Sequence, residues 1–198
     1  MEQNKKIAAI ILAAGEGKRI GTPKWKLMLG DKTFLELILA KLNIAGIKEI
    51  VCVSRASSVP KLKGIKYTIN EKPEYGMISS IFYGVKTFSN FESYLIVPVD
   101  FPLFSTKTVV SLIEFNDGKS VVKPLFNGLA GHPILIPQKL ASCVPNYEYA
   151  GGLKRLIIEL STDVKYVHVD DENVMLNINT EEVYKEALAR YNFKQPNI

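Results

Sequence analysis

Apolar residues along the chain follow two alternating patterns, short continuous runs and longer segments with helical spacing. The continuous runs at residues 7–14, 49–54 and 93–100 are typical of strands buried on both faces of a parallel sheet, and residues 66–70 predict a further short strand. Between them, residues 31–46 and 76–88 place apolar side chains near every third or fourth position, which predicts helices. Strands alternating with helices predict an α/β fold with a mainly parallel sheet.

The second half of the chain continues this alternation with shorter elements. Tyr184, Ala187, Leu188 and Tyr191 share one face of a predicted final helix. The predicted helices span residues 105–115, 150–160 and 180–193, and the predicted strands span 120–126, 132–137, 164–170 and 175–179. No repeat or low-complexity linker interrupts the 198 residues, so we expect one domain covering 1–198.

Composition is that of a soluble globular protein, with 47% hydrophobic and 23% charged residues. The net charge of +5 favours anionic substrates only weakly, and it also serves solubility. No basic stripe interleaved with aromatic residues indicates a nucleic-acid partner. Cys52 and Cys143 lie in dissimilar contexts without a C-x-x-C pair, so neither a disulfide framework nor a zinc site is indicated.

The amino-terminal segment raises the question of targeting. Two lysines precede an apolar run, as in a signal peptide, but the run ends in a cation-rich loop. We interpret the run as the first strand. No apolar stretch reaches the roughly 18 residues that a membrane span requires, so a cytoplasmic protein without a membrane partner is expected.

The loop after the first strand, within "IILAAGEGKRIGTPKWKL", departs from two familiar phosphate-binding patterns. Counted from Gly15, both the Walker pattern and the dinucleotide pattern require a glycine where Ile20 stands. The dinucleotide pattern also wants an acid at the end of the second strand, where this chain has "VSRASS". Arg55 in that segment could read a 2′-phosphate, which keeps an NADP-binding protein as a weak alternative.

The composition of this loop nevertheless suits a triphosphate. Gly15 and Gly17 allow backbone amides to approach an anion closely. Four cations follow within nine residues, which suits a nucleotide whose inner phosphate is attacked while the outer two leave as pyrophosphate. The alternative is a solvated basic loop. The cations are Lys18, Arg19, Lys24 and Lys26.

Residues 12–27, "LAAGEGKRIGTPKWKL", resemble the L-A-A-G-x-S/G-x-R-M-G-x-P-K-x-x-L signature of MobA-like nucleotidyltransferases, most closely the molybdenum cofactor cytidylyltransferase branch. Later segments resemble further family elements. These are "NEKPEYGMISSI" with Asn70, Gly76 and Ser80; "VDFPLF" with Asp100, Pro102 and Leu103; "GHPILI" with Gly131, His132 and Pro133; and "NINTEEVY" with Asn177 and Asn179.

The resemblance implies a fold and an activity. The fold is a single-domain, Rossmann-like three-layer sandwich of the nucleotide-diphospho-sugar transferase type. The activity is transfer of CMP from CTP to molybdopterin cofactor with release of pyrophosphate. A molybdenum hydroxylase is the implied protein partner. The closing segment "NINT" resembles the guanylyl branch more than the cytidylyl branch.

The resemblance also implies roles for individual residues. The implied catalytic residues are Arg19 on the outer phosphates, Lys24 on the α-phosphate and Asp100 as a ligand of Mg²⁺. Asn179 is implied as a second metal contact. The implied nucleotide-binding residues are Leu12, Ala13, Ala14, Gly15, Gly17, Asn70, Gly76 and Ser80.

Several of these residues also have a structural interpretation. Asp100 can start the turn "DFP", and Asn179 can cap the last helix with Glu182 three residues on. Asn70 and Ser80 flank a helix start and can serve turn and capping chemistry. His132, wedged before a proline, is interpreted as structural or as a pterin-side contact rather than a general base.

The choice of nucleotide and acceptor rests on few positions. A methyl at Ala14, where guanylyltransferases tend to have glycine, would narrow the space above the loop and favour a pyrimidine. The G-H-P segment favours the cytidylyl branch, so we expect CTP. The alternatives are guanylyl transfer, transfer onto a sugar or alditol phosphate, and a non-catalytic factor that delivers cofactor.

Overall fold

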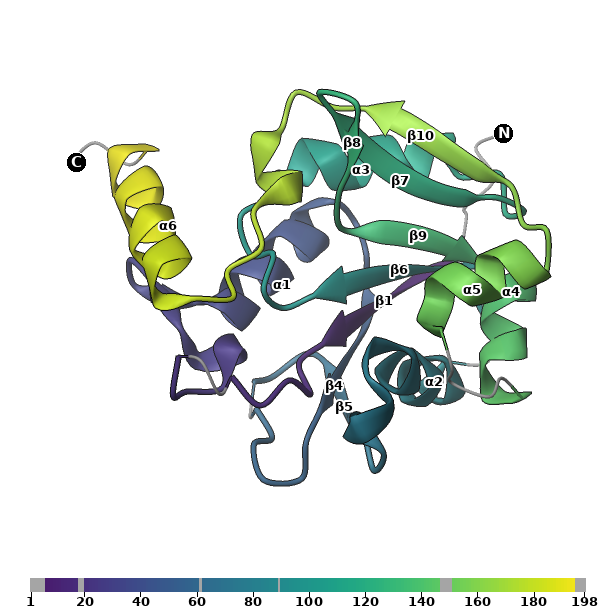
Figure 1. The fold of residues 1–198 in the computed structure, drawn as a ribbon, viewed down its shortest axis with the longest axis horizontal. Helices are drawn as coiled ribbons and strands as arrows, with labels where there is room; N and C mark the ends of the chain where they lie inside the picture. The colour runs from purple at the N-terminus through teal and green to yellow at the C-terminus, as the bar shows by residue number, and fades with distance from the viewer. Residues whose placement is uncertain (1–5, 18–19, 61, 89, 147–150, 195–198) are drawn as a thin grey trace.

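The computed structural model describes residues 6–17, 20–60, 62–88, 90–146 and 151–194 (Figure 1). Its centre is a twisted mixed sheet of order β10-β7-β9-β6-β1-β4-β5, with β8 paired to β7. The strands are β1 (Ile7–Leu12), β4 (Glu49–Ser54), β5 (Lys66–Ile69), β6 (Ser93–Pro98), β7 (Val121–Phe126), β8 (Leu129–Ala130), β9 (Ile134–Pro137) and β10 (Val164–His168). A two-stranded hairpin, β2 (Met28–Leu29) with β3 (Lys32–Thr33), lies apart from this sheet.

Most pairs of neighbouring strands in the main sheet are parallel. β1 pairs in parallel with both β4 and β6, β4 pairs with β5, and β10 pairs with β7, whereas β9 runs antiparallel to β6 and β7. The chain adds β4 and β5 on one side of β1 and then crosses to β6 on the other. In open α/β sheets, ligands bind outside the carboxyl ends of the strands at such a switch point.

Helices cover both faces of the sheet. One hydrophobic core joins the sheet to α1 (Phe34–Ile44), α3 (Thr106–Phe115) and α6 (Glu181–Lys194), and a second joins it to α2 (Met77–Thr87), α4 (Gln138–Cys143) and α5 (Gly152–Glu159). The result is the expected three-layer α/β architecture. Figure 1 shows α6, in yellow, beyond the carboxyl ends of β1 and β6.

Short 3₁₀ turns complete the fold. They are η1 (Lys24–Lys26), η2 (Pro73–Tyr75), η3 (Val144–Asn146) and η4 (Glu172–Met175). In the described residues, no helix combines the length and the apolar character needed to cross a bilayer.

Local sequence explains why the main elements form and pack as they do. All six residues of β1 are buried, as a central strand of a covered sheet requires. Thr33 and Glu36 form a capping box that starts α1. Gly84 lets α2 lie directly against β1, because a Cβ at this position would come within 2.3 Å of the Ile10 side chain.

Pro98 lies in a central strand, although proline is usually confined to edges and bulges. Its partner across the β1–β6 ladder is Leu12, and the next residue, Val99, donates its backbone N–H to the carbonyl of Leu12. The N–H that Pro98 lacks would therefore face the β9 side. There the β6–β9 pairing has already ended at Ile96, so no ladder hydrogen bond is lost, and neither a bulge nor an edge is needed.

One expectation about the elements was wrong, and one helix was not predicted. The segment 175–179 is not a strand: only Met175 belongs to a regular element, the end of η4, and the backbone N–H of Ile178 donates to the carbonyl of Asp100 at 2.9 Å. The short helix α4 follows Pro137 without a sequence signal that we recognised.

Candidate active site

A pocket of about 220 Å³ opens at the carboxyl ends of β1, β4 and β6, at the switch point of the sheet. Most of the residues implied to bind nucleotide line it. These are Leu12, Ala14, Gly15, Asn70, Gly76 and Ser80, together with Asp100, and Arg55, Pro73, Met77 and Pro98 complete the wall. Of the residues implied to bind nucleotide, Ala13 and Gly17 do not line the pocket; Ala13 packs in the core and its N–H bonds to the carbonyl of Val53.

The loop after β1 is compact. Gly17 has a φ of +64°, and a Cβ there would lie 2.1 Å from the carbonyl oxygen of Thr22, so only glycine fits without a shift. The backbone N–H groups of Ile20 and Gly21 both donate to the carbonyl of Gly17 at 3.0 Å. Lys18 and the implied catalytic residue Arg19 lie outside the described residues.

Lys24, Asp100 and Asn179 meet at the pocket. The ammonium of Lys24 lies 2.9 Å from the carboxylate of Asp100, and it also donates to the side-chain oxygen of Asn179. The side chains of Lys24 and Asp100 are 16% and 20% exposed, so the ion pair is largely shielded from solvent. Three implied residues from separate parts of the sequence are thus brought to one point.

Asn179 is free for this contact because another residue caps the last helix. The hydroxyl of Thr180 accepts from the backbone N–H of Val183 at 3.4 Å, and the carbonyl of Thr180 accepts from Tyr184. The interpretation of Asn179 as the helix cap was therefore wrong by one residue. The cap holds the turn in which Asn179 points toward Lys24.

The residues present fit a hard divalent cation. A carboxylate oxygen of Asp100 and the amide oxygen of Asn179 both reach the same nitrogen of Lys24, so one small cation could contact both. Mg²⁺ in nucleotide sites commonly takes one or two protein oxygens and completes its shell with phosphate oxygens and water. Among the described residues, no group of three His, Cys, Asp or Glu side chains offers an all-protein metal site.

The implied contacts Asn70 and Ser80 are tied to each other. The Asn70 amide donates to the hydroxyls of Ser79 and Ser80 at 2.9 Å, and its oxygen accepts from the N–H of Lys72. The bond from Lys72 to Asn70 is the turn bond of the structural interpretation, whereas the expected side-chain cap of the helix is not formed. The bonds of Asn70 also fix the start of α2, whose first turn has no side-chain cap and whose positive end opens on the pocket wall at Gly76.

His132 is half-buried beside the site. Its ring lies 4.8 Å from that of Phe101, and its Nδ1 has no hydrogen-bond partner among the described residues. Burial lowers the pKa of His132 to about 4, so the imidazole is neutral at physiological pH. A neutral, enclosed ring fits the structural interpretation of this residue.

Arg55 also lines the pocket, although the sequence had suggested it only as a reader of a 2′-phosphate. Its Nε donates to the carbonyl of Ala14 at 2.6 Å, and its Nη1 lies 2.9 Å from the carboxylate of Glu16. The guanidinium suggested as a reader of a 2′-phosphate is thus engaged with the opening loop. Its place directly after β4 is the signal that would have assigned it to this pocket.

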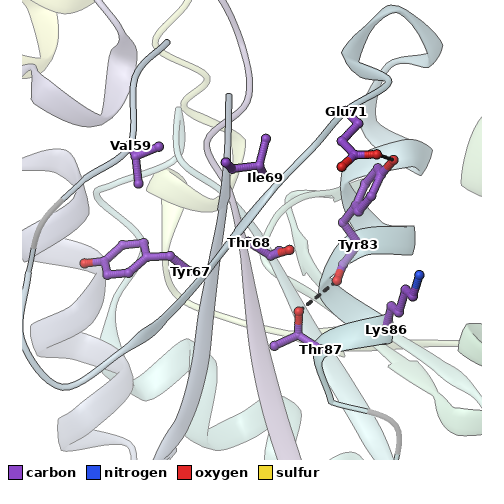
Figure 2. Close-up of a pocket in the computed structure, with 8 residues that line it drawn as sticks. All are labelled: Val59, Tyr67, Thr68, Ile69, Glu71, Tyr83, Lys86 and Thr87. Carbon is purple, nitrogen blue, oxygen red and sulfur yellow. Dashed lines mark hydrogen bonds between the residues drawn. The ribbon is translucent and has the colours of Figure 1, made fainter. Parts of the chain in front are cut away.

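A larger pocket, of about 570 Å³, lies on the other side of β5 and contains none of the implied site residues. Figure 2 shows it between the segment at Val59, the edge strand β5 and helix α2, with Tyr83 directed toward Glu71. We therefore do not assign this pocket to the candidate active site, although it is larger than the pocket at the switch point.

Known proteins resemble this chain along most of its length. A family model described as the MobA-like NTP transferase domain matches residues 9–164. A relative from Bacillus cytotoxicus, named "Probable molybdenum cofactor guanylyltransferase", is 27% identical over 93% of this chain and 98% of its own length. Further Bacillus relatives of similar identity carry the same name.

Solved structures share the fold over nearly the whole chain. A Mycobacterium sp. strain JC1 homologue of Rv0371c has a TM-score of 0.83 and 24% identity, covering 96% of this chain and 98% of its own. The Archaeoglobus fulgidus molybdopterin-guanine dinucleotide biosynthesis protein A has a TM-score of 0.70 and 21% identity, covering 92% and 97%.

Proposed function

Because this chain belongs to the MobA-like NTP transferase family, whose members include nucleotidyltransferases, we propose that it transfers a guanylyl group from GTP to molybdenum cofactor. The observation that carries the proposal is the meeting of Lys24, Asp100 and Asn179 beside the loop of Gly15. A cation and two oxygen ligands at one point suit a reaction in which charge shifts along a triphosphate.

The reaction is an in-line displacement at the α-phosphorus of the nucleotide. A phosphate oxygen of the acceptor forms the new bond, the bond between the α-phosphorus and its bridging oxygen to the β-phosphate breaks, and pyrophosphate leaves. The chain must place two anionic reactants together and neutralise the developing charge. A bound Mg²⁺, held by Asp100 and Asn179, would neutralise phosphate charge there.

The residues of this chain have separable roles in the proposal. Gly15 leaves open space, since a Cβ there would meet nothing within 4 Å, and its backbone can approach the phosphates. Lys24 is proposed to move from the Asp100 carboxylate to the α-phosphate when nucleotide binds. Its compact ammonium suits one phosphate oxygen, whereas the planar fork of Arg19 suits the outer phosphates.

The expectation of CTP is replaced by GTP as the first choice. The relatives that match along almost the whole chain are named guanylyltransferases, and "NINT" at residues 177–180 also resembles the guanylyl branch. The contrary argument rested on the methyl of Ala14. A single methyl in a pocket is worth only about 1–3 kcal/mol of discrimination, so it is a weaker guide than likeness over the whole length.

Cytidylyl transfer remains the second candidate, on the observation that Ala14 does line the pocket. The deciding experiment incubates the protein with Mg²⁺, molybdenum cofactor and equal GTP and CTP, and identifies the dinucleotide by mass. A guanine dinucleotide with release of pyrophosphate is expected. A predominantly cytosine product would move the chain to the cytidylyl branch.

The same reaction separates the remaining alternatives. Release of pyrophosphate only with a sugar or alditol phosphate as acceptor would favour transfer onto that class of acceptor. Binding of GTP without pyrophosphate release under any condition would favour a factor that delivers cofactor. A molybdenum hydroxylase as recipient of the product stays a prediction.

A further inference from the structure

The turn that follows β4 touches both ends of the loop that bears the proposed catalytic lysine. This Arg55–Ser58 turn is closed by a hydrogen bond from the N–H of Ser58 to the carbonyl of Arg55 at 3.0 Å, and the two residues form an isolated antiparallel bridge. It is therefore a defined piece of backbone rather than an extended connection.

One end of the loop is held through Arg55. The guanidinium bonds to the carbonyl of Ala14 at 2.6 Å and to the carboxylate of Glu16 at 2.9 Å, so it spans Gly15 on both sides. A planar guanidinium with two fixed partners orients the backbone between them. Gly15 is the residue whose amide is proposed to face the phosphates.

The other end is held through Ser58. Its hydroxyl accepts from the indole N–H of Trp25 at 3.0 Å. Trp25 directly follows Lys24 inside the 3₁₀ turn η1, which is closed by bonds from Lys26 to Pro23 and from Leu27 to Lys24. The Trp25 ring also packs against the core, and the ammonium nitrogen of Lys26 lies over it, 5.1 Å from the ring centroid. Fixing the indole therefore fixes the backbone from which the Lys24 side chain extends.

Resting on the function proposed above, we propose that the Arg55–Ser58 turn is a positioning element that fastens both ends of the loop and thereby sets where Lys24 lies relative to Asp100. Ser58 is a positioning residue that acts through Trp25 on Lys24. Arg55 acts through Ala14 and Glu16 on the amide of Gly15. Neither residue is needed to supply charge to the reacting phosphorus.

The physical reason is the flexibility of lysine. A lysine side chain has four rotatable carbon–carbon bonds, so its ammonium reaches a defined point only if its backbone is held. A small displacement of a reacting group is costly, since an error of about 1 Å can lower a rate by about a hundredfold. A hydrogen bond to the neighbouring side chain is a direct way to hold that backbone.

Ser58→Ala is the test, with Ser57→Ala as its matched control, because Ser57 is the adjacent exposed serine. We expect Ser58→Ala to lower kcat for GTP about five- to tenfold while the KM for GTP changes by less than about twofold. Ser58→Thr keeps the hydroxyl and is expected to restore kcat. Ser57→Ala should behave like wild type.

Two further readouts distinguish positioning from a general loss of structure. Trp25 is the only tryptophan of the chain, so its fluorescence reports this contact directly, and Ser58→Ala should change its emission whether or not the protein turns over GTP. In a Lys24→Ala background, Ser58→Ala should have no further effect on kcat, because residues acting through one group are not additive.

The inference is overturned if Ser58→Ala retains kcat within about twofold of wild type, or if its effect adds in full to that of Lys24→Ala. It is also overturned if emission is unchanged. A wild-type protein that releases no pyrophosphate from any nucleoside triphosphate would instead contradict the proposed function, and the emission comparison would then decide the contact on its own.

Discussion

The ammonium nitrogen of Lys24 lies 2.9 Å from Oδ2 of Asp100, although 76 residues separate the two in the chain. The side-chain oxygen of Asn179, which lies 155 residues after Lys24 in the chain, accepts a hydrogen bond from the same nitrogen. The lysine thus stands between the two oxygen ligands that the proposal assigns to a metal ion. Lys24 and a divalent cation would compete for the same position.

Lys24→Ala is expected to lower turnover far more than it weakens nucleotide binding. Loss of one aimed cation costs about 3 kcal/mol of transition-state stabilisation, a factor of about 10²–10³ in kcat. Steady-state pyrophosphate release gives kcat and KM together, with Lys63→Ala as a control that removes an exposed lysine. Unchanged turnover in Lys24→Ala would remove this residue from the catalytic set.

Competition between Lys24 and metal leads to a prediction that does not require activity. Lys24→Met keeps most of the length of the side chain and removes its charge, so Mn²⁺, used as a probe for Mg²⁺, should bind Asp100 and Asn179 more tightly in the absence of nucleotide. Electron paramagnetic resonance titration of free Mn²⁺ measures this affinity. Binding no tighter than that of wild type would show that the ammonium and the metal do not share a position.

Asp100→Ala is expected to abolish activity that depends on Mg²⁺ while leaving the fold intact. The side chain contacts Lys24 rather than the core, and its backbone carbonyl, which holds Ile178, is retained. Circular dichroism and a metal titration of the rate test this, with Asp31→Ala as an exposed control. If the variant responds to Mg²⁺ like wild type, the carboxylate serves only the turn "DFP".

Lys41 makes the stability of the protein depend on pH in the alkaline range. It donates to the carbonyl of Pro102 and lies over the ring of Phe104, and burial lowers its pKa from 10.5 to about 8. Below pH 8 both the folded and the unfolded chain keep the proton, so the cost of burying the charge is fully present. Between about pH 8 and 10 only the folded chain loses the proton, so this group makes stability rise with pH.

Lys41→Met tests this sign. Urea unfolding of wild type and variant at pH 7 and pH 9.5 is the measurement. The unfolding free energy of wild type, relative to that of the variant, should be higher at pH 9.5 than at pH 7. Lys48→Met, at an exposed lysine, is the control for the replacement of a lysine by methionine. A difference that is constant with pH would mean that Lys41 titrates at its ordinary value.

Gly84→Ala is expected to destabilise the fold by about 1–3 kcal/mol, since a new methyl must be forced into a packed core. The added Cβ would lie 2.3 Å from the Ile10 side chain and would push α2 away from β1. Thermal unfolding measures the loss, and Ile10→Ala removes the Cγ2 atom that the new Cβ would meet, so Gly84→Ala should cost less stability in the Ile10→Ala background than in wild type. A Gly84→Ala variant as stable as wild type would contradict this tight contact.

The periodicity of the sequence was sufficient to predict the layers and most elements of the fold. Strands β1, β4 and β6 are continuous apolar runs because both of their faces are covered, and α1 and α2 show helical spacing because each has one covered face. Local chemistry was less decisive where two residues compete for one role. Asn179 and Thr180 can both cap a helix, and only the path of the chain assigned the cap to Thr180.

The candidate site shows the same division. The glycines of the opening loop and the acid at the end of β6 were recognisable from the sequence, because each has a local signature of spacing and strand end. The contact of Lys24 with Asp100 and Asn179, and the hold of the Arg55–Ser58 turn on that loop, join residues from separate elements. Spacing along the chain carries no information about which loop ends meet, and the crossing of the chain at β1 decides it.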